Sequence, residues 1–250
     1  MNINPKTNDG AAPEGSRDRQ SAAHAVREMF TSIAPRYDFL NHTLSLNVDR
    51  LWWRRTARAF RDKLSQPNVR VLDLCCGTGD MTLALWRNGR NPSAKIVGVD
   101  FSRAMLERAH YKTRTMPLRW VEADALQLPF ADNSFDLITS AFGFRNLADY
   151  NAGLREIFRV LRPGGEFGIL DFSEPGGLTG KLYRVYFKHV LPAIGTWISG
   201  VKGPYAYLPA SVERFPSPDE MLERIRQADF HGAQWQAYTF GIAGLYRGKK

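Results

Sequence analysis

The sequence contains little cysteine and no long apolar run. Cysteine occurs only twice, at the adjacent positions Cys75 and Cys76, and neighbouring residues rarely reach disulfide geometry, so free thiols in a reducing compartment are expected. The most apolar segment, residues 183–201, is interrupted by charged, proline and glycine residues, whereas a membrane-spanning helix needs about eighteen apolar residues in a row. These absences predict a cytoplasmic protein without a transmembrane segment.

Metal-ligand spacing and a targeting signal are also missing. The histidines are scattered, with no spacing that suits a metal ion; they are His24, His42, His110, His189 and His231. Residues 1–21 are polar and lack the apolar stretch that follows a basic start in a signal peptide. We therefore predict no metal centre and a disordered tail over residues 1–21.

The chain has 250 residues, of which 44% are hydrophobic and 24% charged, the composition of a globular protein. This length permits a single domain whose core needs no disulfide or metal. The net charge of +9 is uneven, because segments 26–63 and 181–250 carry +4 and +5 while residues 64–180 are neutral. Such basic flanks suit nucleic acid or an anionic membrane as a partner, although they also suit plain solvated helix faces.

Hydrophobic periodicity divides the chain into helices and strands. Two helices, within 22–33 and 51–65, precede the main fold, and strands then alternate with helices from Val69 onward. This alternation predicts an α/β fold with a doubly wound, mostly parallel seven-stranded sheet. The expected strands are 69–74, 95–99, 118–122, 135–141, 165–172 and an edge pair, 234–240 with 242–248; the expected later helices are 81–87, 102–112, 151–161, 182–191 and 219–228.

We assign residues 22–250 to one domain made of four segments. Residues 22–66 are expected to form a helical lid, and residues 69–174 a cofactor-binding core. Residues 175–218 are expected to form an insertion that covers the substrate, helical at first and irregular up to Pro218. Residues 219–250 supply the last helix and the edge strands.

The first strand of the expected sheet is followed by a glycine turn, Gly77-Thr78-Gly79. In an open parallel sheet the ligand lies beyond the carboxyl ends of the strands, and glycines there let it approach the backbone. The dinucleotide fingerprint G-x-G-x-x-G is not met, because Thr82 occupies its last position and Asp80 would repel a pyrophosphate. The loop therefore predicts a nucleoside without phosphates.

Acidic residues follow three consecutive strands. Asp100 lies 21 residues after Gly79, close to the spacing of about 20 at which a carboxylate receives ribose hydroxyls. Asp124 and Ala125 come directly after the third strand, where a carboxylate can accept the exocyclic amine of adenine. With Asp73 near a cationic group, these positions favour S-adenosylmethionine, although each acid alone also suits a loop cap.

Further motifs surround this loop. They read VREMF (26–30), APRYD (34–38), Asn41, Ser45, RLW (50–52), VLDLCCGTGD (71–80), LPFADNSFD (128–136), FGFRN (142–146) and RVLRPGG (159–165). With these motifs the chain resembles, from about Val26 to its end, the class I S-adenosylmethionine methyltransferases. Within them it is similar to the C-methyltransferases of menaquinone and ubiquinone biosynthesis, for which the regions of Tyr37 and of Arg145-Asn146 are specific.

The resemblance implies a Rossmann-like class I methyltransferase fold. It also implies cofactor contacts at Thr78, Asp100, Asp124 and Ala125 beside the glycines Gly77 and Gly79. Two places depart from the family pattern. Ala141 stands where the family often has serine, with Ser140 one residue earlier, and residues 47–49 replace a Gly-x-His near the expected mouth of the quinone pocket.

Methyl transfer to an aromatic carbon needs a nucleophilic ring, which forms when a neighbouring hydroxyl loses its proton. Arg145 near that oxygen would lower its pKa, and Asn146 or Tyr37 would hold the ring by hydrogen bonds. These three are the predicted catalytic residues. Each also has a simpler structural explanation, a turn with a helix cap for Arg145 and Asn146 and a helix-boundary anchor for Tyr37. Trp52 and Trp53 are expected to pack the core and lid.

Other functions stay open. A nucleic-acid methyltransferase suits the charge, but enzymes of that kind that methylate base amines usually carry an Asp/Asn-Pro-Pro-aromatic turn where this chain has residues 140–143. A non-catalytic subunit of a quinone-synthesis assembly would not need the cofactor residues. We predict conversion of demethylmenaquinol to menaquinol, with a methoxy-benzoquinol of ubiquinone synthesis as the alternative substrate. The expected partners are this polyprenylated quinol, an anionic membrane contacted peripherally and a second copy of the chain, without nucleic acid.

Overall fold

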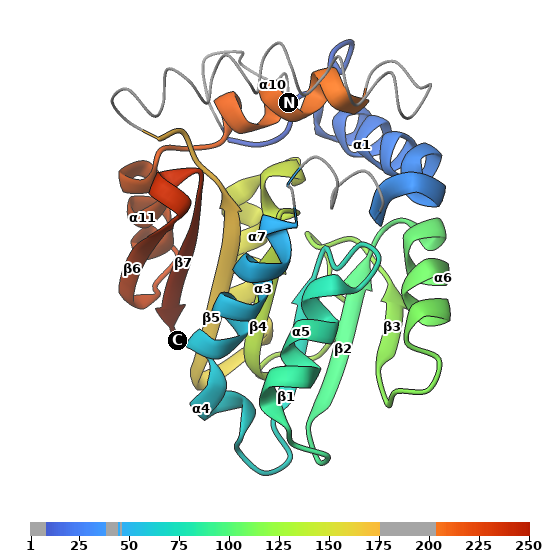
Figure 1. The fold of residues 1–250 in the computed structure, drawn as a ribbon. Coiled ribbons are helices and arrows are strands. Elements are labelled where there is room, and N and C mark those ends of the chain that lie inside the picture. Colours follow the sequence, from blue (N-terminus) through green and yellow to red (C-terminus); the bar gives the residue numbers. More distant parts are fainter. Residues whose placement is uncertain (1–8, 39–44, 46, 176–203) are drawn as a thin grey trace.

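The computed structural model describes residues 9–38, 45, 47–175 and 204–250. Its centre is a seven-stranded sheet in the order β3-β2-β1-β4-β5-β7-β6, shown in Figure 1. Neighbouring strands are parallel from β3 to β5 and antiparallel from β5 to β6, so the predicted sheet and edge pair are confirmed. The strands are β1 (Arg70–Leu74), β2 (Lys95–Asp100), β3 (Arg119–Glu122), β4 (Phe135–Ala141), β5 (Leu161–Phe172), β6 (His231–Tyr238) and β7 (Ala243–Lys249).

Helices cover both faces of the sheet and the carboxyl ends of its strands. One face packs against α3, α4 and α5 and the other against α7 and α11, while α1 and α10 lie across the carboxyl ends (Figure 1). The helices are α1 (Arg19–Ile33), η1 (Ala34–Arg36), α3 (Val48–Ala59), α4 (Arg61–Leu64), α5 (Asp80–Gly89), α6 (Arg103–Lys112), η2 (Phe144–Asn146), α7 (Tyr150–Val160), α10 (Pro204–Arg214), α11 (Pro218–Gln227) and η4 (Thr239–Gly241). The sheet is therefore doubly wound, as predicted.

Strand β1 divides its side chains between two cores. Val71 packs among residues of α3, α4 and α5, whereas Leu72 and Leu74 pack among residues of α7 and α11. Because both faces of a parallel strand are covered, the buried residues of β1 are apolar with one exception. The exception is Asp73, whose side chain is fully buried.

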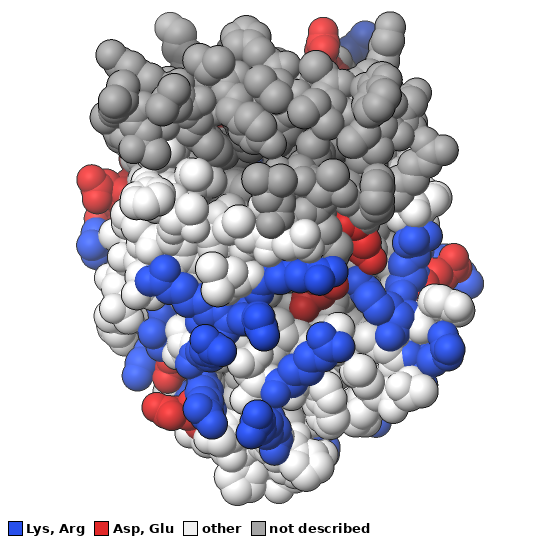
Figure 2. Space-filling model, viewed as in Figure 1, with Lys and Arg blue, Asp and Glu red and all other residues white. Residues whose placement is uncertain are grey.

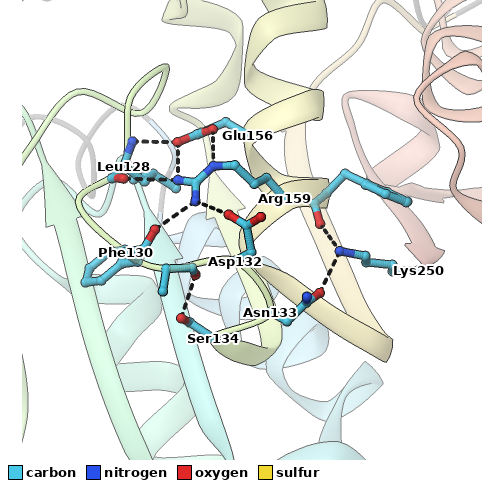
Figure 3. A network of polar contacts seen from close by, with 10 residues as sticks. Leu128, Phe130, Asp132, Asn133, Ser134, Glu156, Arg159 and Lys250 are labelled. Atoms are coloured by element: carbon cyan, nitrogen blue, oxygen red, sulfur yellow. Dashed lines mark hydrogen bonds and ion pairs between the residues drawn. The ribbon is translucent and has the colours of Figure 1, made fainter.

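One arginine holds the segment between β3 and β4. Arg159 of α7 donates to the backbone carbonyl oxygens of Leu128 at 3.1 Å and Phe130 at 2.8 Å. Its guanidinium also bonds the carboxylates of Asp132 at 2.7 Å and Glu156 at 2.6 Å, as Figure 3 shows. These charge-assisted bonds are of the strong kind. The residues on which the family resemblance partly rests therefore stabilise the fold here.

The N-terminal boundary differs from the prediction. Helix α1 begins at Arg19, and the segment before it is ordered, since the N–H of the buried Ala11 donates to the Leu147 carbonyl oxygen at 2.7 Å. The carbonyl oxygen of Asp9 likewise accepts from the Tyr150 N–H at 2.8 Å. The predicted disordered tail is thus wrong for residues 9–21, because backbone groups pair with a neighbouring loop whatever the polarity of the side chains.

The segment before Pro218 also differs, because helix α10 occupies positions expected to be irregular. Val212 near the end of this helix is buried, and Phe215 just beyond the helix joins the core. The predicted helix over 182–191 lies outside the described residues. Helix α11 is confirmed, with a capping box between Ser217 and Glu220. Among the residues that the structure describes, no helix has both the length and the apolar character needed to cross a bilayer.

Candidate active site

A cavity of about 340 Å³ lies at the carboxyl ends of the central strands, within the size range of small-molecule sites. Its wall includes residues from the ends of β1, β2, β4 and β5 and from α1, α3 and η4. All but one of the predicted site residues line it, namely Tyr37, Gly77, Thr78, Asp100, Asp124, Ala125, Arg145 and Asn146. The remaining one is Gly79.

The two glycines of the turn have different surroundings. Both have positive φ angles, 54° for Gly77 and 83° for Gly79, a region that favours glycine. A Cβ on Gly77 would meet only the Tyr37 ring, at 4.0 Å, so the cavity above this backbone is open to a ligand. A Cβ on Gly79 would lie 2.6 Å from the Trp120 indole. Gly79 therefore lies behind the wall, where its small size lets Trp120 pack.

The acids after β2 and β3 are oriented by backbone N–H groups. Asp100 accepts from the N–H groups of Gly77 at 2.8 Å and Ser102 at 2.9 Å, one on each oxygen, and burial raises its pKa to about 6. Each carboxylate oxygen has a second acceptor position, as a ribose diol requires. Asp124 is exposed and accepts from the Leu126 N–H at 2.8 Å, which directs it at the cavity edge.

Asp73 at the end of β1 is a buried carboxylate that also lines the cavity. It accepts from the hydroxyls of Thr82 at 2.5 Å and Thr139 at 2.8 Å. Burial raises its pKa to about 6, and within the described residues no cation forms an ion pair with it. A buried charge without a partner is unfavourable. A cationic ligand would relieve this cost, so the site fits the sulfonium and amine of S-adenosylmethionine.

Arg145 in η2 is buried and fixed on several sides. Its Nη1 donates to Asp171 Oδ1 at 3.0 Å and to the Phe142 carbonyl oxygen, and its Nε donates to Ser211 Oγ at 3.3 Å. The backbone N–H of Arg145 also reaches Asp171 Oδ2 at 3.0 Å. Within the described residues Nη2 has no such partner, and the side chain lines the cavity. One face of the guanidinium therefore remains for a ligand oxygen.

The other two predicted catalytic residues also reach the cavity. Asn146 Oδ1 accepts from the Tyr207 hydroxyl of α10 at 3.1 Å, and burial raises the pKa of Tyr207 to about 12, so this hydroxyl stays protonated. Tyr37 lies 6.0 Å from the Phe30 ring, edge to face. Asn41, which the family resemblance also includes, lies outside the described residues.

Thr78 connects the glycine turn to the N-terminal segment through Asp38. Its hydroxyl donates to Asp38 Oδ1 and accepts from Lys112 Nζ at 3.2 Å. Lys112 also bonds Asp38 at 3.0 Å and Asp80 at 2.8 Å. The Thr78 side chain, predicted to contact the cofactor, is thus hydrogen-bonded to Asp38 and Lys112, and Asp80 is neutralised by a lysine.

An aromatic wall closes the end of the cavity beside Arg145. Phe142 and Phe172 have ring centroids 4.6 Å apart, and Trp52 lies 5.7 Å from Phe142. Trp52 is buried in this cluster, as expected of a packing residue. Trp52 and Trp53 also line the cavity, so their packing surface is the wall of an apolar compartment.

The departures from the family pattern alter this wall. Ala141 lines the cavity, whereas Ser140 is buried with no hydrogen-bond partner for its Oγ among the described residues. The cavity wall at this position therefore presents the methyl group of Ala141 in place of the family's serine hydroxyl. Asp49, which stands in place of the family's histidine, is buried and also faces the cavity.

Both cysteines are free thiols, as predicted. Burial raises the pKa of Cys75 and of Cys76 well above the ordinary value. Thiols of this kind stay protonated at neutral pH and are poor nucleophiles. The pair therefore shapes the wall and does not suggest covalent chemistry.

Sequence reasoning missed the residues that hold the predicted ones in place. Asp171 is the single acid in the apolar end of β5, and that isolation is a signal for a buried ion pair. Asp38 lies in the APRYD motif and Lys112 in no motif, and since neither shares a motif with Thr78, their contacts with it were not predicted. Tyr207 lies in the stretch where no periodicity was visible, and only the fold brings it to Asn146.

Comparison with known proteins gives a family and close relatives. A model of the ubiE/COQ5 methyltransferase family matches residues 17–250. The chain is 49% identical over 236 residues to the demethylmenaquinone methyltransferase of Deinococcus radiodurans, covering 93% of this chain and 95% of that protein. It is 48% identical to the protein of the same name from Thermus thermophilus, covering 89% and 100%. It is 43% identical to the ubiquinone/menaquinone biosynthesis C-methyltransferase UbiE of Geotalea daltonii, covering 90% and 96%.

Solved structures share the fold at low sequence identity. An S-adenosylmethionine-dependent methyltransferase from Thermotoga maritima superposes with a TM-score of 0.62 at 20% identity, over 89% of this chain and 99% of the other. The [4+2]-cyclase SpnF superposes with a TM-score of 0.67 at 17% identity, over 97% and 98%. Since one of these is a cyclase, the fold alone does not specify the reaction.

Proposed function

Because the chain belongs to the ubiE/COQ5 methyltransferase family, we propose that it methylates a ring carbon of demethylmenaquinol to give menaquinol. The family makes it an S-adenosylmethionine-dependent methyltransferase; the quinol is the proposed part. One observation carries it: a single cavity joins the acids suited to a cationic nucleoside with an aromatic compartment and a buried arginine.

The nucleoside end of the cavity fits the cofactor through its acids. Asp100 offers two oriented oxygens to the ribose, and Asp124 with Ala125 receives the adenine edge. Asp73 holds negative charge near the place where the cation would lie. S-adenosylmethionine, when bound, supplies a methyl group on a positively charged sulfur.

The aromatic end fits a flat, apolar ring. Phe142, Phe172 and Trp52 give stacking surfaces and exclude water. In this compartment Arg145 directs its remaining donor at a ring hydroxyl and lowers the pKa of that hydroxyl. The phenolate that forms when the hydroxyl loses its proton has a higher electron density at the neighbouring ring carbon, and the methylated carbon then loses its own proton to restore the aromatic ring. Asn146, fixed by Tyr207, and Tyr37 orient the ring. Alignment of the carbon with the methyl group supplies much of the rate.

The names of the relatives support the choice of substrate. Demethylmenaquinone methyltransferases at 49% and 48% identity favour the naphthoquinol, and the protein at 43% identity carries both quinones in its name. A methoxy-benzoquinol of ubiquinone synthesis is therefore the second candidate. A purely scaffolding role is disfavoured, because the acids and the arginine keep a ligand-ready geometry.

In the test, purified protein is incubated in detergent with methyl-labelled S-adenosylmethionine and one of two quinols, demethylmenaquinol or a methoxy-benzoquinol. Each quinol carries a short prenyl tail. Label in the first product supports the proposal, and label only in the second moves the substrate to ubiquinone synthesis. Label in neither, with S-adenosylmethionine binding intact in a calorimeter, would refute quinol methylation.

We further propose that the enzyme works in the cytoplasm as a peripheral membrane protein and forms a homodimer. A polyprenylated quinol resides in the bilayer, so the enzyme must meet its substrate there. Light scattering tests the dimer, and the membrane contact is developed below.

A further inference from the structure

Exposed large apolar side chains are few on the described surface, and two of them lie on elements that both contribute to the cavity wall. Leu51 of α3 is 56% exposed and Phe240 of η4 is 85% exposed, whereas Tyr111 lies elsewhere, on α6. Single exposed apolar residues are ordinary. Two of them on neighbouring elements of a cavity with an apolar compartment require an explanation.

A hydrogen bond joins the two elements that carry these side chains. Trp52 Nε1 of α3 donates to Thr239 Oγ1 of η4 at 2.8 Å. Leu51 and Phe240 are the chain neighbours of these bonded residues. Trp52, Thr239 and also Ile242 line the cavity, so each exposed side chain comes from a residue adjacent in the chain to one in the cavity wall.

The backbone of η4 holds Phe240 outward. Phe240 has φ 58° and Thr239 has φ 45°, both in the left-handed region that residues with a Cβ rarely adopt. Strain of this kind is concentrated at functional sites. Here it keeps a large aromatic side chain in solvent although apolar residues of the sheet lie next to it.

Arginines flank Leu51 along α3. Arg50, Arg54, Arg55 and Arg58 are all exposed on α3, and within the described residues none of them forms an ion pair. By contrast, Arg159 is neutralised by carboxylates. Figure 2 shows basic side chains gathered over α3 and the elements beside it. The charge of this face is therefore available to an external partner.

We propose that the α3 rim, made of Arg50, Leu51, Arg54, Arg55 and Phe240, docks on the surface of a bilayer that contains anionic phospholipids. The arginines contact lipid phosphates, and Leu51 and Phe240 insert among the acyl chains. This inference rests on the proposed function, because the enzyme needs to bind a bilayer only if its substrate is a quinol embedded there. Docking places the cavity mouth against the layer that holds the substrate.

A lipid surface suits the rim better than nucleic acid does. Backbone contacts to nucleic acid use basic and polar side chains, and an exposed leucine adds nothing to them. An aliphatic and an aromatic side chain flanked by arginines match the composition of interfacial membrane anchors. Binding should therefore need both the anionic lipid and the apolar pair.

The test compares three variants of the full-length protein by co-sedimentation with vesicles of phosphatidylcholine, with or without phosphatidylglycerol. Arg50→Glu with Arg54→Glu removes charge from the rim, and Phe240→Ser removes the aromatic anchor. Arg70→Glu with Lys95→Glu is the matched control, because these exposed residues pair at the amino ends of β1 and β2, away from the rim. Each arginine near an anionic surface contributes about fivefold, so loss of two positive charges alone weakens binding by about thirtyfold, and the double reversal should weaken it by at least that much.

The expected result is binding of wild type and control to the anionic vesicles and loss in both rim variants. Rim variants that bind like wild type would overturn the proposal. So would binding of a single-stranded RNA oligonucleotide, lost in the arginine variant, in place of vesicle binding. Activity on the short-tailed quinol in detergent should be unchanged in the rim variants, and activity on a long-tailed quinol in vesicles should fall. If wild type is inactive on both quinols, the proposed function fails while the vesicle result still decides the docking.

Discussion

Replacing Asp73 with asparagine should make the cofactor-free protein more stable and weaken its binding of S-adenosylmethionine. The carboxylate is fully buried and has no cationic partner among the described residues. Burial raises its pKa from 3.8 to about 6. Two units correspond to about 3 kcal/mol, which is the cost of keeping this group charged in the folded state at pH 7.5.

Asparagine avoids this cost without disturbing the packing. Its amide has nearly the same shape, and the hydroxyls of Thr82 and Thr139 can either donate or accept, so both hydrogen bonds survive. The variant should therefore gain up to about 3 kcal/mol, which raises the melting temperature by roughly 6–12 °C in a domain of this size. Loss of the negative charge should at the same time weaken S-adenosylmethionine binding by about tenfold or more.

The pH dependence identifies the cause. A carboxyl whose folded pKa is raised contributes stability that is complete below its unfolded pKa, near 4, and is lost as the pH rises through about 6. The stability difference between Asp73→Asn and wild type should thus vanish near pH 4 and reach a plateau above pH 6. Thermal unfolding followed by circular dichroism across this range measures it, and titration calorimetry measures cofactor binding.

A matched control is Asp62→Asn, an exposed acid outside the cavity, which should change stability little and leave cofactor binding intact. The reasoning fails if Asp73→Asn lowers the melting temperature at pH 7.5. It also fails if the difference is the same at pH 4, or if S-adenosylmethionine binds the variant as tightly as wild type.

Three further changes test the other contacts. Asp100→Ala should abolish detectable S-adenosylmethionine binding in calorimetry while the protein stays folded; retained binding would remove the ribose role. Gly79→Ala should destabilise the protein by about 1–3 kcal/mol in urea unfolding, because a methyl group would lie 2.6 Å from Trp120 at a φ of 83°, and an unchanged midpoint would contradict this. Asp171→Asn should destabilise by about 3–5 kcal/mol, opposite in sign to Asp73→Asn, because it leaves the buried Arg145 charge uncompensated; equal signs for the two would show that the partner cation does not matter.

The local pattern of residues was sufficient for the sheet and for the glycines and acids of the cavity wall. A strand buried on both faces is mainly apolar, and glycines and acids at strand ends meet at one edge of a parallel sheet. For this reason Gly77, Asp100 and Asp124 were found before any contact was known, and the structure brings them into one cavity with Arg145, which the family resemblance supplied. The family motifs carried the same information.

The partners of these residues depend on tertiary structure alone. Lys112 reaches Asp38 across 74 positions and Asp171 reaches Arg145 across 26, and no local periodicity encodes such pairs. Residues 9–18 are ordered by backbone hydrogen bonds to a distant loop, which their composition does not reveal. The α3 rim has the same origin, since Leu51 and Phe240 are far apart in the chain and only the fold joins their two elements, through the bond of Trp52 to Thr239. Sequence determines which side chains a segment can bury, whereas the packing of segments decides which of them come into contact.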